Sequence, residues 1–248
     1  RELDEATLLK NYVLPEFHSL PLAQKESVCQ IIREKWAAFG SSNDLIEVLK
    51  ITPFVKRQNS ASGEVVFVQP SRLLDPRNEL VACVFSDDKS NFPAEEFSCD
   101  EWLDILQKVG LKDVVDKDAF LECAWKVEAD QSVPKAMKLL AYYQENFGSF
   151  FDQEFGRKLA NIKCVPAEIP GSPVDTLFRF CDVAASKDRH IVFKSLPVMP
   201  DSVCPPQVMF STLGIVSPPS ISTVLKHVRA LTDNSEVLEH WSYPNGTA

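Results

Sequence analysis

The sequence of 248 residues lacks the features that mark membrane-spanning, secreted and nucleic-acid-binding proteins. It holds no run of about 18 apolar residues, the length that a transmembrane helix needs. The amino-terminal stretch RELDEATLLKNYV is charged, prone to form a helix and without an initiator Met, which indicates a piece of a longer chain rather than a signal peptide. The net charge is −9 and the Lys and Arg residues are scattered, whereas a phosphate backbone is bound by clustered cations. We therefore expect neither nucleic acid nor a membrane as a partner.

The residue patterns that catalysis and cofactor binding require are missing as well. All eight glycines are isolated, so no glycine-rich loop of the kind that cradles a phosphate is present. No serine stands in a G-x-S-x-G motif, and no pair of cysteines forms C-x-x-C. The four histidines, which include His18 and His240, lie too far apart in sequence for a zinc-binding motif. The sequence predicts no catalytic residue, no cofactor, no metal ligand and no enzymatic activity.

One catalytic alternative stays open, because the partners of a nucleophile meet in space rather than in sequence. The nearest candidate is Cys204 together with His190 or His227. Such a set would make the chain a Cys hydrolase, and a serine nucleophile would make it a Ser hydrolase. We expect neither.

Two other groups of reactive side chains have ordinary structural explanations. The acidic groups at 87–88, 95–96 and 113–118 could bind a cation, but solvated loops and helix amino-termini account for them better. The cysteines are odd in number, widely spaced and set among apolar neighbours, so we expect free, buried thiols in a reducing compartment. They are Cys29, Cys83, Cys99, Cys123, Cys164, Cys181 and Cys204.

Helical patterns occupy the first 161 residues, with one break. Apolar residues recur at helical spacing over 20–40, where Gly40 is placed to end the helix, and again over 132–147. Between them, a β-prone run, turn residues and a second β-prone run predict a hairpin over 51–68.

Three helix starts are predicted from capping residues. Asp75 is a candidate N-cap with Pro76 at the first helical position, and Ser98 forms a capping box with Glu101. The next helix should begin near Asp116 or at the aspartate two residues later.

Beyond residue 161 the composition changes. Nine of the 17 prolines fall between residues 166 and 219, among β-prone stretches, and helical patterns return at 206–213 and 219–231. We predict an α+β fold that is predominantly α-helical, with helical hairpins, one small β-hairpin and a Pro-rich mixed carboxy-terminal lobe. The predicted division is a mainly helical lobe at 1–161 and a smaller mixed α/β lobe at 162–248.

The chain also repeats one pattern. Residues 109–127 (VGLKDVVDKDAFLECAWKV) and 213–231 (LGIVSPPSISTVLKHVRAL) align without a gap, with Gly second in each and apolar residues in register. Glycine tolerates the positive φ of a tight corner. Each copy therefore predicts the end of one helix, a Gly turn, and a second helix that folds back on the first as an αα-hairpin. An aromatic residue, Trp102 or Phe210, precedes each turn on the first helix.

Several motifs together resemble the sacsin internal repeat. They are LLDPRNELVACVFSDDKSNFPAEEF, WLDILQKVGLK, FLECAWKVE, IKCVPAE and IVFKSLPVMP followed by LGIVSPPSISTVLKHV. Their order and spacing carry the resemblance over about residues 45–231, although KCVPAE lacks the tryptophan of the family and LGIVSPP lacks an aromatic residue after Gly. The glycine-rich nucleotide signature of the family's ATPase domain is absent here, so the resemblance places the chain after that domain.

The resemblance implies a function. Sacsin-like proteins are very large, cytoplasmic, and associated with chaperone and protein-quality-control roles, and each of their repeats begins with a chaperone-type ATPase domain. We expect a non-catalytic scaffold for protein–protein interaction, which couples a neighbouring ATPase domain of the same chain to client or partner proteins. Apolar stripes at 22–38, 132–147 and 219–231 are candidate docking surfaces, although such stripes usually form a module's own core. The alternative is a passive spacer.

Overall fold

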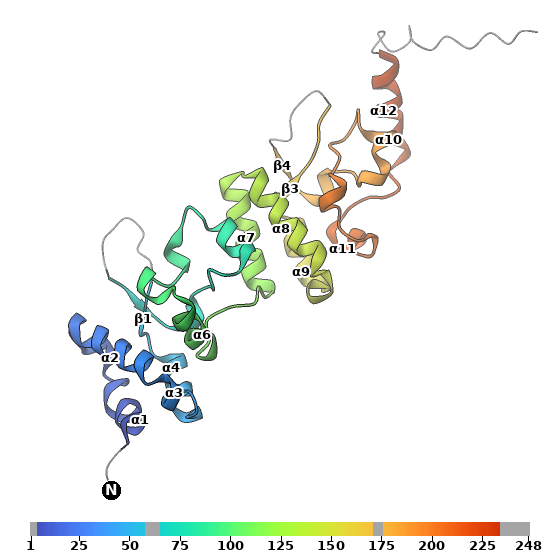
Figure 1. Cartoon of the computed structure of the whole chain (residues 1–248). Helices are drawn as coiled ribbons and strands as arrows, with labels where there is room; N and C mark the ends of the chain where they lie inside the picture. Colours follow the sequence, from blue (N-terminus) through green and yellow to red (C-terminus); the bar gives the residue numbers. More distant parts are fainter. Residues whose placement is uncertain (1–3, 58–64, 171–175, 234–248) are drawn as a thin grey trace, which may run out of the picture. The chain divides into compact units, whose positions relative to one another are not determined.

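The computed structural model describes residues 4–57, 65–170 and 176–233, and it is predominantly helical (Figure 1). The described strands form two antiparallel two-stranded sheets. This confirms the predicted fold class, α+β with a large excess of helix. In the described part of the chain, every helix is too short or too polar to cross a lipid bilayer.

The chain divides into two compact units, which we call unit 1 (Arg1–Val115) and unit 2 (Asp116–Ala248). The sequence placed the division at residue 161, whereas the structure places it after Val115. The reason is packing inside unit 2. Its helix α8 (Val133–Glu145) contacts strand β3 (Val165–Pro166), and its helix α9 (Gln153–Ala160) packs on α11 (Phe210–Leu213). The helices between 116 and 160 therefore share a unit with the Pro-rich segment.

Unit 1 places short helices before and after a small hairpin. Its helices are α1 (Glu5–Leu8), α2 (Leu22–Glu34), α3 (Trp36–Phe39), α4 (Asn43–Ile51), α5 (Glu79–Val84) and α6 (Asp100–Lys108), and a π-helical turn (Leu9–Val13) follows α1. The strands are β1 (Val55–Lys56) and β2 (Phe67–Val68), with Val55 opposite Val68. This confirms the predicted hairpin, but Ile51 ends helix α4 instead of starting a strand, and the predicted turn at 58–64 lies outside the described residues.

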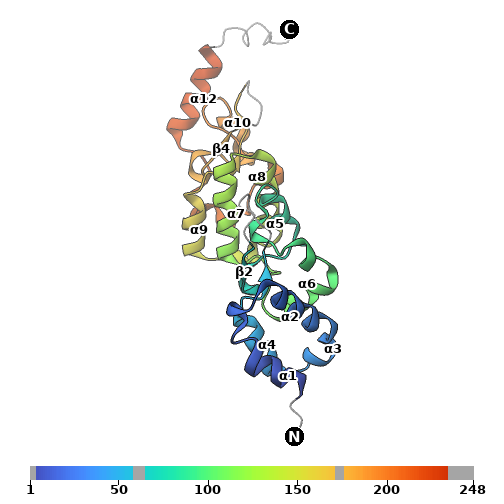
Figure 2. The same ribbon diagram turned by 90° about the vertical axis from the view of Figure 1, so that its left-hand side faces the viewer.

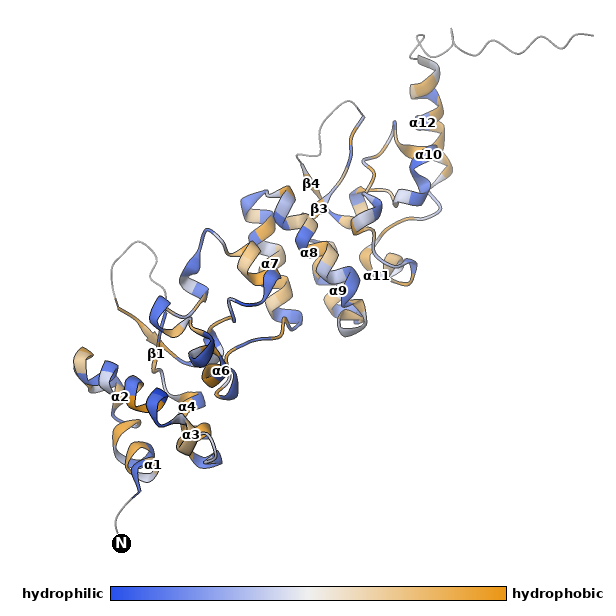
Figure 3. Cartoon of the chain, viewed as in Figure 1, coloured by the Kyte–Doolittle hydropathy of each residue, from blue (hydrophilic) through white to orange (hydrophobic). Residues whose placement is uncertain are grey.

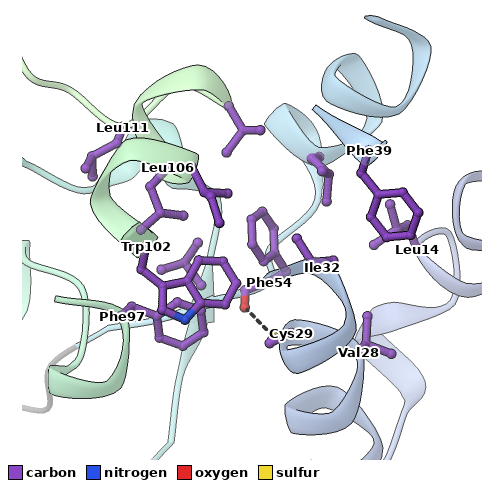
Figure 4. Packing of buried hydrophobic residues seen from close by; sticks show 14 of the residues in the cluster. Leu14, Val28, Cys29, Ile32, Phe39, Phe54, Phe97, Trp102, Leu106 and Leu111 are labelled. Carbon is purple, nitrogen blue, oxygen red and sulfur yellow. Dashed lines mark hydrogen bonds between the residues drawn. The ribbon is translucent and has the colours of Figure 1, made fainter. Parts of the chain in front are cut away.

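The core of unit 1 forms where α2, α4 and α6 meet around the hairpin (Figure 4). Ile32 of α2, Leu49 of α4 and Leu106 of α6 are fully buried, and so is Phe54, directly before β1. The thiol of Cys29 donates a hydrogen bond to the backbone carbonyl of Phe54 at 3.4 Å. These residues show why the helical stripe at 20–40 exists: its buried face holds α2 on the hairpin.

Two predicted N-caps in unit 1 are wrong, because other hydrogen-bond partners take the capping side chains. Helix α5 begins three residues later than predicted, and Asn78 caps it by accepting from the backbone amides of Leu80 and Val81. Asp75 is instead buried, where its carboxylate accepts hydrogen bonds from the Arg77 guanidinium at 2.9 Å and from the Gln107 amide at 3.0 Å. This network ties the loop before α5 to α6.

The capping box at Ser98 is also absent. Cys99 occupies the N-cap position of α6, and the Ser98 hydroxyl donates to the backbone carbonyls of Pro93 and Ala94. The carboxylate of Glu101 points away from the cap and accepts from the Arg33 guanidinium at 2.6 Å. The predicted start near Asp116 is confirmed, since the Asp116 carboxylate accepts from the backbone amide of Ala119 at 2.8 Å.

Unit 2 repeats the mixture of helices and one hairpin. Its helices are α7 (Lys117–Asp130), α8 (Val133–Glu145), α9 (Gln153–Ala160), α10 (Arg189–Val192), α11 (Phe210–Leu213) and α12 (Ile221–Asp233), and its strands are β3 (Val165–Pro166) and β4 (Leu177–Phe178). Val165 lies opposite Phe178 in the antiparallel pair.

Aromatic side chains fill the first half of unit 2, where α7 lies beside α8 and α9 (Figure 2). The ring of Phe120 on α7 lies 5.7 Å from that of Tyr143 on α8, 4.8 Å from that of Phe150 and 5.8 Å from that of Phe155 on α9, measured between centroids. All four side chains are buried. Offset and edge-to-face pairs of this kind add to the free energy that burial alone supplies.

Both repeated glycines turn the corner predicted for them, but the second helix does not fold back as expected. Gly110 has φ +106° and Gly214 has φ +75°, the conformations that favour glycine. In the second copy, α12 packs on α10, while α11 packs on α9. In the first copy, α6 and α7 belong to different units. In the second copy the predicted αα-hairpin is therefore wrong, since α11 and α12 each pack on another helix.

The contact between α9 and α11 depends on a glycine. A Cβ atom added at Gly156 would lie 2.2 Å from Cγ2 of Thr212, whereas a Cβ atom at Gly148 would meet nothing within 4 Å. We expect Gly156→Ala to lower the free energy of unfolding of the chain by about 1–3 kcal/mol, despite the better helix propensity of alanine. Urea denaturation followed by circular dichroism measures the change. Gly148→Ala is the matched control and should be neutral or slightly stabilising; equal losses in both variants would contradict the close approach.

The buried carboxylate of Asp75 gives a second stability prediction. Asp75→Ala leaves Arg77 and Gln107 without their shared acceptor, so we expect a loss of about 2–3 kcal/mol. Asp104→Ala removes an acceptor of the same Arg77 whose side chain is 66% exposed, and we expect a loss of no more than about 1 kcal/mol. Denaturation curves of the two variants measure the loss of unfolding free energy in each. A larger loss in Asp104→Ala than in Asp75→Ala would show that the exposed Arg77–Asp104 pair holds the loop instead.

Candidate binding groove

A groove on unit 1 is a candidate site for binding a partner. Its volume is about 300 Å³, and it opens between α2, the β1–β2 hairpin and the start of α6. Phe97 and Trp102 form its floor, with ring centroids 4.7 Å apart (Figure 4). Cys29 and Phe67 add further apolar surface. Aromatic rings with few polar groups around them are typical of binding pockets.

The rim of the groove is charged, with both signs present. The Lys56 ammonium lies 2.7 Å from the Glu96 carboxylate, and Arg33 donates to Glu101 from the other side. Partial burial opposes ionisation of Glu96, but hydrogen bonds and the charge of Lys56 outweigh it and hold the pKa of the carboxyl below its ordinary value. Glu96 is therefore ionised at neutral pH, and the charges of Lys56, Glu96 and Arg33 are already paired.

The thiol of Cys29, at the wall of the groove, is not a nucleophile. Burial raises the pKa of Cys29 to about 12, and the nearby charge of Glu26 acts in the same direction. Since the thiolate is the reactive form, this group stays protonated and unreactive at neutral pH. The groove can thus offer apolar contact and ion-pairing groups to a ligand, and the thiol adds only packing.

The structure does not assemble the candidate Cys hydrolase site. His227 is buried on α12, and its Nδ1 accepts a hydrogen bond from the backbone amide of Lys194 at 3.0 Å. His190 lies exposed on α10, and Cys204 is half-buried with its carbonyl bonded to Gln144. Among the described residues, no hydrogen bond joins the Cys204 thiol to either imidazole.

The acidic groups lie apart from one another in the fold. Asp88 caps a 3₁₀ turn, Glu96 pairs with Lys56, and Asp116 caps α7. Within residues 4–57, 65–170 and 176–233, no three His, Cys, Asp or Glu side chains gather closely enough to hold a metal ion.

The three predicted apolar stripes differ in how far the fold buries them. The stripe of α2 is largely buried through Val28, Cys29 and Ile32, and that of α8 is buried through a set that includes Leu139 and Tyr143. Along α12, hydrophobic residues recur among hydrophilic ones (Figure 3). They stay largely exposed: Ile221, Leu225, Val228 and Leu231 are 80%, 51%, 47% and 36% exposed. The sequence could propose these stripes but could not tell which of them the core would use.

The groove itself was not predicted from the sequence. Its walls come from residues as far apart as Glu26 and Trp102, and they meet only after the hairpin brings α2 and α6 together. The capping box predicted at Ser98 even assigned a different role to Glu101. A local signal existed only in the spacing of Glu26, Gln30 and Arg33, which puts three polar residues on one face of α2.

Comparison with known proteins supports the resemblance seen in the motifs. A stretch of 190 residues is 30% identical to human sacsin, and the match covers 67% of this chain. The chain spans about 4% of the length of sacsin. No protein-family model matches the chain, and no solved structure matches it. The similarity supports a sacsin-related protein.

The thiols give a prediction about reactivity. All seven cysteines are free; Cys29, Cys123 and Cys164 are buried, whereas Cys99 and Cys181 are exposed, so the expectation of buried thiols is wrong for the last two. Burial raises the pKa of Cys123 and Cys164 to about 12, as it does for Cys29.

We expect iodoacetamide at pH 8 to alkylate Cys99 and Cys181 in the native chain at least tenfold faster than the three buried thiols, which should react only after unfolding. Peptide mass spectrometry against time measures the rates, with the chain in urea as the reference. Fast native labelling of Cys164 would contradict the buried core of unit 2.

Proposed function

We propose that the chain is a non-catalytic interaction module of a sacsin-related chaperone that acts in cytoplasmic protein quality control, and that it binds client proteins in the groove of unit 1. In this function a neighbouring chaperone-type ATPase domain of the same parent chain acts on the client that the module holds. The similarity to sacsin supports the proposal that the chain belongs to a chaperone-related protein. The groove is the observation that supports client binding.

The groove fits an extended peptide segment better than a folded surface. Its aromatic floor can take one apolar side chain, and a volume of about 300 Å³ has room for a large one. The Lys56–Glu96 and Arg33–Glu101 pairs offer both charge signs to the residues that flank this side chain. Such a site selects for exposed apolar residues in a polar chain, which is the mark of an unfolded client.

Holding the client needs no reactive group in this module. Two sites joined by one chain see each other at an effective concentration far above that of free molecules. A groove of modest affinity therefore suffices to keep a client within reach of the ATPase domain.

An obstructed groove tests the proposal. The probe is reduced, carboxymethylated α-lactalbumin, which cannot refold, immobilised and used to retain the chain. Gln30 is exposed on α2 and lines the groove, so Gln30→Trp should place an indole across its opening and lower retention at least fivefold. Gln24→Trp makes the same change on another, equally exposed face of α2 and should leave retention unchanged.

Three outcomes would contradict the proposal. Equal retention of both variants would show that the groove is not the binding site. Failure of the parent chain to be retained above a polar control protein would favour a passive spacer. Stoichiometric labelling of the folded chain by a thiol-directed or serine-directed activity probe, abolished by unfolding, would favour a hydrolase.

A further inference from the structure

The two units repeat one order of elements. In unit 1, α1, α2, α3 and α4 precede the hairpin β1–β2; in unit 2, α7, α8, the 3₁₀ helix Phe147–Phe150 and α9 precede the hairpin β3–β4. Each hairpin is followed after one residue by a three-residue 3₁₀ helix, Pro70–Arg72 or Phe180–Asp182, and then by α5 or α10. Each unit next reaches a helix, α6 or α11, that is followed by a glycine with positive φ.

The helix after each of these glycines holds an equivalent place. Helix α7 begins seven residues after Gly110 (110 to 117), and α12 begins seven residues after Gly214 (214 to 221). Since α7 is the first helix of unit 2, α12 stands where the first helix of a further module would stand. This inference is independent of the groove.

Burial differs sharply between the equivalent residues of the two helices. Leu121 of α7 is 4% exposed, whereas Leu225 of α12 is 51% exposed. Val127 is fully buried, whereas Leu231 is 36% exposed. A third equivalent pair shows the same difference, since Ala124 is 0% exposed and Val228 is 47% exposed. Helix α12 thus has the same pattern of apolar residues as α7, but in the described part of the chain it lacks the packed helices that bury this pattern in α7.

The cover of α7 is visible in unit 2. Helices α8 and α9 both pack on α7, and Phe120 lies among Tyr143, Phe150 and Phe155 of the segment that they enclose. Helix α12 packs on α10, and His227 accepts from the Lys194 amide. This contact leaves Leu225, Val228 and Leu231 exposed along α12. We call these three residues the α12 stripe.

We propose that α12 is the first helix of a third copy of this module, and that the α12 stripe docks a helix pair of the α8–α9 kind. The partner is thus an antiparallel pair of amphipathic helices with an aromatic apolar face. It is neither a second α12 from another molecule nor an unfolded client.

A chain with an added module tests the docking. Residues 130–233 are joined directly after Asp233, so that α12 takes the place of α7 before a second copy of α8 and α9. Leu225→Cys is introduced into this extended chain and into the chain that ends at Asp233, and alkylation of the new thiol is followed by peptide mass spectrometry. We expect labelling to be at least tenfold slower in the extended chain. Arg229→Cys is the matched control, because Arg229 is exposed on α12 and its equivalent Trp125 is 53% exposed on α7, so its rate should not change.

Two results would overturn the inference. Equal labelling rates at 225 in the two chains would show that the stripe does not accept an α8–α9 pair. A rate at 225 that falls with rising protein concentration in the shorter chain would show that a second copy of α12 covers the stripe. Helix α7, which α8 and α9 cover in both chains, supplies the reference for a fully protected thiol. Leu121→Cys should therefore be alkylated slowly in both chains.

Discussion

The structure depends on one constraint: an amphipathic helix at the start of a unit must be covered by the helices that follow it in sequence. Full burial of a Leu, Val or Phe side chain stabilises a protein by about 1.5–3 kcal/mol relative to exposure, and a helix as short as α7 is marginal by itself in water. Helix α7 meets this requirement through α8 and α9, with Phe120 at the centre of their contact. The hairpin then closes the unit by contacting α8.

This constraint explains why a glycine ends the chain segment of α6 and of α11. Gly110 and Gly214 adopt positive φ, which ends one helix and turns the chain before the next helix begins. The helix that follows Gly214 stays within unit 2 and has a partner other than α11. In the second copy that partner is α10, and His227 fixes the contact by accepting from the backbone amide of Lys194.

The sequence predicted the features that a single local preference controls and missed those that depend on competing hydrogen-bond partners or on tertiary contacts. The helix start at Asp116, the corners at Gly110 and Gly214 and the hairpin after α4 follow from capping, φ preference and β propensity, and the structure has them. Asp75 and Ser98 are good capping residues by local rules, yet Arg77, Gln107 and backbone carbonyls compete for their side chains in the folded chain. The groove could not be predicted for the same reason, since its floor and its rim come from elements that meet only after folding.

A comparison of the two units shows that the groove belongs to unit 1 and is not a general property of the module. In unit 1, α2 and the turn Glu95–Phe97 line opposite sides of the groove. In unit 2 the equivalent helix, α8, packs directly on the equivalent turn, Asp201–Val203, and Gln144 donates to the carbonyl of Cys204 at 2.6 Å. The polar face of α2 thus borders an opening where α8 makes a contact. Because unit 2 folds with this contact closed, the open form in unit 1, with Trp102 lining it and ion pairs at its rim, is not required by the order of elements that the two units share.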